Sequence, residues 1–132
     1  MRDPNNPCLF CYFKESDCAN ENDLAYSSYD TYPVSDLHCL IIPKRHIKDY
    51  FELTNDELIA CNDLIKKTKD QILKKDKSVK GFNLGTNIGK VSGQSIHHCH
   101  FHLIPRRRGD VKNPQGGVRS VIPSKQHYKR KI

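Results

Sequence analysis

The stretch Ser95-Ile96-His97-His98-Cys99-His100-Phe101-His102-Leu103-Ile104 decides how this chain is expected to fold. It places histidines at three alternate positions and apolar residues between them. Side chains along a strand point alternately to its two faces, so the three imidazoles are expected to share one face. The intervening side chains are expected to point toward a core. The histidines of this row are His98, His100 and His102, and the core-facing residues are Cys99, Phe101 and Leu103.

A row of imidazoles indicates shared chemistry, because unpaired imidazoles are poor packing material. Clustered imidazoles disfavour one another's protonation, so at least one is expected to be neutral near pH 7. A neutral imidazole can attack phosphorus and form a phosphoramidate. His100, flanked on both sides, is the best candidate for this nucleophile, and His98 and His102 are expected to orient it, donate to phosphate oxygens or protonate the leaving group. A row that binds metal without a function is the alternative interpretation.

Polar residues just before the histidine row are suited to contact a phosphate. Gly93-Gln94-Ser95 offers an amide and a hydroxyl at the entrance of the expected strand. Asn87 and Gly89 lie at the other end of the same turn. These groups are suitable hydrogen-bond donors to a bridging or leaving oxygen.

Length and composition indicate one soluble globular domain. The chain has 132 residues, of which 36% are hydrophobic and 28% charged, and a chain of this size buries about two thirds of its unfolded surface. Its apolar runs are shorter than the roughly 18 residues that span a bilayer, and its first residues lack the apolar core of a signal peptide. Six cysteines without a secretory signal favour reduced thiols and a cytoplasmic location.

The net charge of +7 raises the question of nucleic-acid binding. The lysines are spread along an expected helix and a basic tail, Lys125 to Lys131, rather than gathered in one recognition element. A solvated helix face and a loose terminus explain this pattern, and a positive field that attracts a polyphosphate is the functional alternative. Charge by itself does not separate the two.

The remaining pattern predicts an α+β fold. Apolar segments at 24–29, 38–42 and 81–87 predict three further strands, and the histidine strand is expected to end at Pro105. Thr54-Asn55-Asp56-Glu57 is a capping box that predicts the start of an amphipathic helix of about five turns. Strands, one long helix and then strands again indicate a sheet with the helix packed on one face. The apolar positions of the helix are Leu58, Cys61, Leu64, Ile65, Thr68, Ile72 and Leu73.

Cys8-Leu9-Phe10-Cys11 contains a pair of cysteines whose role the sequence leaves open. Together with His46 and one histidine of the row, the pair would complete a zinc site with two cysteine and two histidine ligands. The two cysteines would otherwise be packed thiols. A redox pair is the third interpretation, although the strand and helix that flank a thioredoxin-like motif are missing from the pattern.

Two blocks of this sequence resemble the histidine-triad (HIT) family. Residues 93–106 resemble the family signature, in which three histidines alternate with hydrophobic residues. Residues 36–47 are similar to the family's other recurrent block, and the distance between the blocks also fits. The resemblance covers about residues 8–123, and the most similar subgroup is that of small microbial HIT hydrolases. It implies a single HIT domain over residues 1–132, with 111–132 an extended C-terminal segment.

The resemblance also implies a fold and roles for individual residues. The fold is α+β, with an antiparallel sheet of about five strands, a long helix packed on it and pairing into a homodimer. His100 corresponds to the family's nucleophile, which attacks the α-phosphate of a nucleotide and becomes nucleotidylated, and His98 and His102 are the flanking members. His38 matches a fourth histidine near the site. Gln94 and Ser95 correspond to residues that contact the scissile and leaving-group oxygens. Asp30 corresponds to the residue that contacts the ribose, and Asn87 to a residue on the phosphate side. Phe10 and Phe13 correspond to residues that line the base pocket.

In metal-bearing members of the family the zinc ligands correspond to Cys8, Cys11, His46 and His98. All four residue types are present here. The resemblance therefore implies a structural zinc ion that fixes the strand, while His100 stays free for attack. Zinc is not expected to be the electrophile.

The function that the resemblance implies is that of a hydrolase or nucleotidyl transferase acting at the α-phosphate of a substituted purine nucleotide, through a covalent nucleotidyl-histidine. The substituent would be an amine, as for a nucleoside phosphoramidase, or a second nucleotide, as for a diadenosine polyphosphate hydrolase. The alternative is a non-catalytic nucleotide-binding or zinc-bearing interaction module. Processing of nucleic-acid ends is not expected, because related proteins use a separate DNA-binding module. The expected partners are a nucleotide and a second copy of the chain, with neither a membrane nor nucleic acid.

Overall fold

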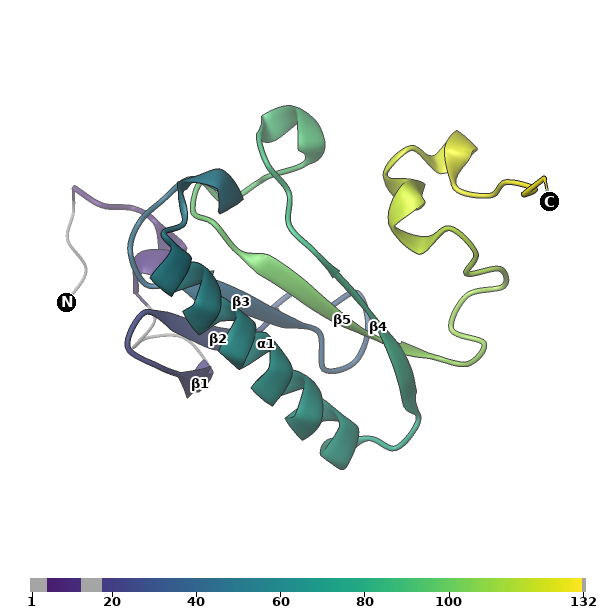
Figure 1. Cartoon of the computed structure of the whole chain (residues 1–132), viewed down its shortest axis with the longest axis horizontal. Helices are drawn as coiled ribbons and strands as arrows, with labels where there is room; N and C mark the ends of the chain where they lie inside the picture. Colours follow the sequence, from purple (N-terminus) through teal and green to yellow (C-terminus); the bar gives the residue numbers. More distant parts are fainter. Residues whose placement is uncertain (1–4, 13–17, 132) are drawn as a thin grey trace.

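The sheet and its single long helix follow the predicted α+β arrangement. The computed structural model describes residues 5–12 and 18–131. Its five strands form one antiparallel sheet in the order β1-β2-β3-β5-β4, and α1 packs on one face of it (Figure 1). The elements are β1 (Cys18–Glu21), β2 (Ala25–Tyr29), β3 (Cys39–Pro43), α1 (Asn55–Lys75), β4 (Val79–Gly85) and β5 (Phe101–Arg107), with 3-10 turns at Leu9–Cys11, Tyr50–Glu52, Lys90–Ser92, Gly117–Val121 and Pro123–Lys125.

Helix α1 begins at the predicted capping box. The Thr54 hydroxyl accepts a hydrogen bond from the Glu57 amide at 3.1 Å, and the Glu57 carboxylate accepts one from the Thr54 amide at 2.9 Å. Arg45, at the end of β3, donates two hydrogen bonds to the same buried carboxylate and lowers its pKa to about 2. This carboxylate therefore joins the start of α1 to the residues that precede His46.

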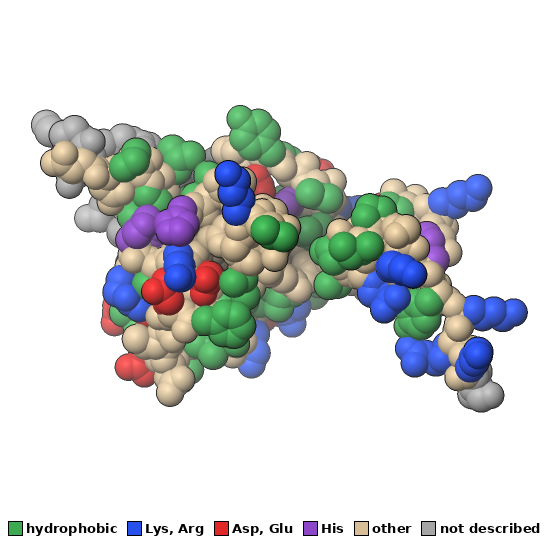
Figure 2. Space-filling view, turned by 90° about the horizontal axis from the view of Figure 1, so that it is seen from above, with side chains coloured by type: hydrophobic (Ala, Val, Ile, Leu, Met, Phe, Trp, Pro, Cys, Tyr) green, Lys and Arg blue, Asp and Glu red, His purple; other side chains and the backbone are tan. Residues whose placement is uncertain are grey.

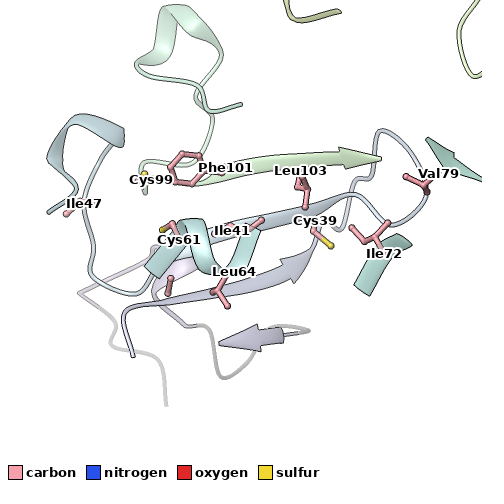
Figure 3. Packing of buried hydrophobic residues seen from close by; sticks show 11 residues of the cluster. Cys39, Ile41, Ile47, Cys61, Leu64, Ile72, Val79, Cys99, Phe101 and Leu103 are labelled. Carbon is pink, nitrogen blue, oxygen red and sulfur yellow. The ribbon is translucent and has the colours of Figure 1, made fainter. Parts of the chain in front are cut away.

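The core lies between α1 and the sheet, and buried thiols form part of it (Figure 3). Cys39, Cys61 and Cys99 are each at most 1% exposed. Burial raises the pKa of Cys39 to about 11 and those of Cys61 and Cys99 to about 12, so they remain thiols and pack as small hydrophobic groups. The prediction that Cys39 and Cys99 are free and buried is confirmed.

The histidine strand differs from the prediction at both of its ends. Pairing with β3 begins at Phe101, because Cys99 donates its amide to the Ile47 carbonyl instead, at 2.7 Å. The alternation nevertheless holds, with Cys99, Phe101 and Leu103 buried in the core. The strand also continues through Pro105, which pairs with Phe82 of β4 beyond the last residue that pairs with β3. The Pro105 carbonyl accepts from the Ser35 hydroxyl at 2.7 Å, so the side of the residue that lacks an amide faces away from β4 and does not interrupt that ladder.

One further strand prediction needs correction, and one strand has no counterpart among the predictions. β4 begins and ends two residues earlier than the predicted 81–87, because Asp76 and Ser78 form a tight turn directly after α1. β1 was not predicted, because Cys-Ala-Asn-Glu carries none of the alternation or β-branched residues that indicate a strand. It is an edge strand that owes its conformation to pairing with β2.

The C-terminal residues after β5 extend away from the sheet (Figure 1). Lys and Arg side chains gather on this part of the surface (Figure 2). Arg119 is held by the backbone of the same segment, since it donates to the Lys125 carbonyl at 2.8 Å. Within the described residues, no helix combines the length and the hydrophobicity needed to cross a bilayer.

Candidate active site

Four sulfur and nitrogen ligands meet beside the histidine row. Cys8 and Cys11 come from the N-terminal 3-10 turn, His46 follows β3, and His98 precedes β5. The Cys8 sulfur lies 3.3 Å from His98 Nδ1, and the Cys11 sulfur lies 3.2 Å from His46 Nδ1. His46 Nδ1 and His98 Nδ1 are 3.2 Å apart. All four ligand atoms lie within 4.8 Å of one another, which is the arrangement of a four-coordinate metal site.

The backbone determines which nitrogen of His98 faces this cluster. His98 Nε2 lies 2.7 Å from the Pro43 carbonyl, which can only accept a hydrogen bond. Nε2 therefore carries the proton, and the lone pair of Nδ1 faces the two sulfurs. A metal-bound histidine ordinarily donates its other ring nitrogen to such an acceptor. The donor set and this outer partner together fit a zinc ion.

His100 is oriented by the opposite tautomer. Its Nδ1 lies 2.8 Å from the His98 carbonyl, so this nitrogen is the donor and Nε2 keeps a free lone pair. The side chain is buried, with 6% exposure. Burial also lowers the pKa of His100, which keeps the ring neutral near pH 7. A neutral imidazole with an unshared lone pair is a nucleophile.

His102 belongs to a second cluster, with Asp30 and His38. The Val34 amide donates to His38 Nδ1 at 3.0 Å, so His38 Nε2 carries the proton and faces His102 Nδ1 at 3.0 Å. His102 is then protonated on Nε2 and presents an N–H group. Asp30 lies 3.5 Å from His38 Nε2. Burial lowers the pKa of His102 to about 4, with His100 and His38 adding to the effect.

The loop before the histidine row is held by one amide side chain. Gln94 accepts from the Gly89 amide at 3.0 Å and donates to the carbonyls of Lys48 and Ile96. Gly89 and Gly93 both have positive φ, 87° and 95°, which glycine adopts without a Cβ penalty. Gln94 thus ties the loop to the residues after β3, and Ser95 next to it is exposed.

The remaining predicted residues divide into two groups around the histidines. The Phe10 ring packs edge-on against His100, with centroids 5.0 Å apart. Asn87 and His102 both line a cavity of about 720 Å³ between the β4–β5 face and the C-terminal residues. Asp30 is oriented by the Tyr32 amide as well as by its position beside His38. Phe13 lies outside the described residues.

Several groups that set this geometry were missed by the sequence analysis. The Pro43 carbonyl and the Val34 amide fix two tautomers, and such backbone groups have no sequence signal. Thr86 was also missed; its hydroxyl donates to the His100 carbonyl at 2.7 Å and holds the start of β5 against the end of β4. Tyr26 donates to the Phe10 carbonyl at 2.7 Å.

The fold and site together are those of a histidine-triad protein: an antiparallel sheet with three alternating histidines where an inner strand begins. A family model for the HIT domain matches residues 14–109, and the chain belongs to this family. Among solved structures, a hypothetical histidine triad nucleotide-binding protein of Sulfolobus tokodaii is 36% identical. It superposes with a TM-score of 0.72, and the match covers 78% of this chain and 71% of that one.

Two relatives carry names that describe activities. The chain is 32% identical to the adenosine 5'-monophosphoramidase of Candida albicans, over 76% of this chain and 70% of that protein. It is 37% identical to an adenylylsulfatase of Arabidopsis thaliana, over 80% of this chain and 55% of that protein. These relatives establish that proteins of this family include hydrolases.

Proposed function

We propose that this protein cleaves substituted purine nucleotides at the α-phosphate, through a covalent nucleotidyl intermediate on His100. The observation that carries the proposal is the 2.8 Å contact between His100 Nδ1 and the His98 carbonyl, which can only accept; Nδ1 is therefore the donor, and Nε2 is free to attack. Burial supports it by keeping this ring neutral. The names of two relatives support an adenylyl substrate with a variable leaving group.

The reaction would proceed in two displacements. His100 Nε2 forms a bond to phosphorus while the bond from phosphorus to the leaving group breaks, and the leaving group departs with the bonding electron pair, as ammonia from an N-protonated phosphoramidate or as a nucleotide anion from a dinucleoside polyphosphate. The positive charge that develops on the imidazole is stabilised by the His98 carbonyl, which already accepts from Nδ1. Water then attacks the same phosphorus, the P–N bond breaks, and the nucleoside monophosphate is released with His100 regenerated.

The neighbouring histidine would act as a hydrogen-bond donor in both displacements. His102 is neutral, since its pKa is lowered to about 4, and its Nε2–H is therefore suited to donate to a phosphate oxygen. It is poorly suited to protonate the leaving group at pH 7. Ser95 and Asn87 are proposed to contact the leaving-group and phosphate oxygens, and Asp30 the ribose.

The metal site is proposed to be structural. Cys8, Cys11, His46 and His98 would hold zinc, which would supply a rigid cross-link between the N-terminal turn and His98, two residues before the nucleophile. The sulfur and ring-nitrogen atoms of the site are directed toward one another rather than toward His100.

The experiment that tests the proposal is mass spectrometry of protein quenched early in turnover. We expect adenosine 5'-phosphoramidate or diadenosine polyphosphate to leave one adenylyl group on His100. His100→Gln is expected to give no adduct and to lower kcat by about 10³-fold or more, as for loss of a covalent nucleophile. Tight binding of AMP without turnover of either compound would instead identify a non-catalytic nucleotide-binding module.

We also propose that the protein is a homodimer. β4 is an edge strand of the sheet, and Leu58 and Leu84 remain 37% and 48% exposed beside a groove of about 310 Å³. Leu58 belongs to the apolar positions predicted to be buried on α1, and a second copy would cover it. Size-exclusion chromatography of the wild type and of Leu84→Lys tests this, with a monomeric wild type contradicting it.

A further inference from the structure

The side chain that touches the proposed nucleophile belongs to the same short turn as two of the metal ligands. Phe10 lies within the 3-10 turn Leu9–Cys11, one residue before Cys11 and two after Cys8. Its ring is 5.0 Å from the His100 ring and 6.1 Å from the His98 ring, edge-on to both. Consecutive Cα atoms are about 3.8 Å apart, so fixing both sulfurs fixes the position of Phe10 closely.

The rest of the contact surface of Phe10 is provided by the sheet face opposite α1. Its ring packs against a small apolar cluster of Tyr26, Leu40 and Ile42. Tyr26, itself 1% exposed, donates its hydroxyl to the Phe10 carbonyl. Leu40 pairs directly with His102, so this cluster adjoins the row of histidines. Phe10 therefore forms a wall over His100 on the side away from the 720 Å³ cavity, which His102 lines.

The metal site joins this wall to the body of the protein over long sequence separations. Cys8 and His98 are 90 residues apart, and Cys11 and His46 are 35 apart. A metal ion bound by all four residues would close these long loops and restrict the N-terminal turn to the docked position. Without the ion, the described contacts between the turn and the sheet are those of the Phe10 ring, the hydrogen bond from Tyr26 and the weaker sulfur–imidazole contacts of Cys8 and Cys11.

We infer that metal binding and nucleotide binding are coupled through Phe10, which acts as a positioning residue over His100. Metal at the four-residue site docks the N-terminal turn, and the docked Phe10 completes the nucleotide pocket. The inference rests on the proposed function only in placing the nucleotide at His100. By thermodynamic reciprocity, a nucleotide must then raise the affinity for metal by the same factor as metal raises the affinity for nucleotide.

The absence of tryptophan from the chain makes docking of the turn directly measurable. In Phe10→Trp, the single tryptophan replaces the ring that contacts His100. We expect chelation of zinc to shift its emission to the red and to open it to acrylamide quenching. Ile59→Trp, on the solvent side of α1 and 59% exposed, is the matched control and is expected not to respond. Unchanged tryptophan emission from the Phe10→Trp variant after chelation would overturn the inference.

The coupling itself is measured on the wild type with AMP as the probe. We expect zinc to strengthen AMP binding about tenfold, within the roughly 5–150-fold range of typical couplings. Saturating AMP is expected to strengthen zinc binding, measured by competition with a chromophoric chelator, by the same factor. Equal AMP affinity with and without zinc, in protein that still cleaves its substrate, overturns the coupling alone. AMP binding to neither form overturns the coupling and the proposed function together.

A variant of Phe10 separates positioning from a general effect of metal on stability. Phe10→Ala keeps all four ligands, so zinc is expected to bind. In this variant zinc is expected to leave the affinity for AMP unchanged, a ratio of about one. Phe10→Leu is expected to restore part of the coupling. A full tenfold coupling in Phe10→Ala would show that metal acts without Phe10 and would overturn the assignment. The zinc-loaded forms of Phe10→Ala and of the wild type are also compared directly, and weaker AMP binding by the variant is expected even where the metal-free chain unfolds.

Discussion

Two clusters of metal-ligating side chains lie on either side of the proposed nucleophile, and their chemistry differs. One consists of Cys8, Cys11, His46 and His98, and the other of Asp30, His38 and His102. In each cluster the ligand atoms lie within 4.8 Å of one another, so spacing alone does not distinguish them. The difference lies in the backbone group that contacts the ring nitrogen pointing away from the cluster, in His98 of the first cluster and in His38 of the second.

In the first cluster that backbone group is an acceptor, and in the second it is a donor. The Pro43 carbonyl accepts a hydrogen bond from His98 Nε2–H, so the lone pair of Nδ1 faces the two sulfurs. The Val34 amide donates to His38 Nδ1 and so requires the proton to sit on Nε2, facing His102. A protonated nitrogen cannot coordinate a cation. The first cluster is therefore suited to bind metal. The second is suited to fix the tautomer of His102, so that His102 presents its Nε2–H to the active site.

The largest expected effect separates the two clusters by metal binding. Cys11→Ser is expected to weaken zinc binding by more than about 100-fold, because even an outer partner of a ligand is worth roughly 10–100-fold. Asp30→Asn is the matched variant in the second cluster and is expected to leave one zinc per chain. Metal content after dialysis, with a chelator titration, measures both. A second zinc ion that is lost in Asp30→Asn would break the distinction.

A smaller effect is expected from removing the histidine that orients His102. His38→Leu leaves the Val34 amide without its acceptor and His102 Nδ1 without its donor. We expect kcat to fall by about 10- to 100-fold, at the low end of what general acid–base groups contribute.

Two further measurements show whether the fall in kcat comes from the lost orientation of His102. His38→Gln keeps an amide that can both accept and donate, so part of kcat is expected to return. Zinc content is expected to stay at the wild-type level in both variants. A His38→Leu protein with wild-type kcat would show that the tautomer of His102 is set by other groups.

The pH dependence of stability gives a third, more modest test of the second cluster. The pKa of His102 is about 4 in the folded protein, lowered first by burial, against about 6.5 for an unfolded histidine. Between these values the unfolded chain binds more protons, so the free energy of unfolding falls as pH drops from about 6.5 to 4. His102→Asn is expected to reduce that slope by up to about 1.4 kcal/mol per pH unit, equivalent to one proton.

Urea denaturation at several pH values measures the slope for the wild type and the variant. Comparing the two proteins cancels the contributions of the histidines that do not contact His102. The stabilising contribution is fully present above about pH 6.5 and is lost toward about pH 4. Equal slopes for the two proteins would mean that His102 titrates in the folded state as it does in the unfolded chain.

The sequence predicts the parts of this structure that depend on periodicity and on local capping. The alternation around His100 places the core residues correctly, and Thr54 with Glu57 marks the start of α1. Both signals come from neighbours within a few residues. The resemblance to the HIT family adds the fold, and the structure brings its four implied metal ligands together.

What the sequence does not predict depends on contacts with single backbone groups, whether near or far along the chain. The strand ladder begins at Phe101 rather than at the first histidine, because the Cys99 amide meets the Ile47 carbonyl. The tautomers of His98 and His38 depend on Pro43 and Val34, which are 55 and 4 residues away. Any residue presents a carbonyl, and any residue except proline an amide, so neither group leaves a pattern in the sequence. The domain boundaries and the roles of Ser95, Asn87 and Asp30 stay predictions.

The smallest expected effect concerns the cavity on the His102 side of the site, and it distinguishes leaving groups. Val118 lines this cavity, whereas Ile122, on the same C-terminal stretch and also exposed, does not. If leaving groups extend into the cavity, Val118→Trp is expected to lower kcat/KM for diadenosine polyphosphate by up to about tenfold, the scale on which a pocket discriminates small changes in apolar volume. Cleavage of adenosine 5'-phosphoramidate, whose leaving group is ammonia, is expected to stay unchanged, and Ile122→Trp is expected to change neither. An equal loss of kcat/KM for both substrates in Val118→Trp would place the cavity outside the path of the leaving group. The role of the second cluster would then be limited to orienting His102.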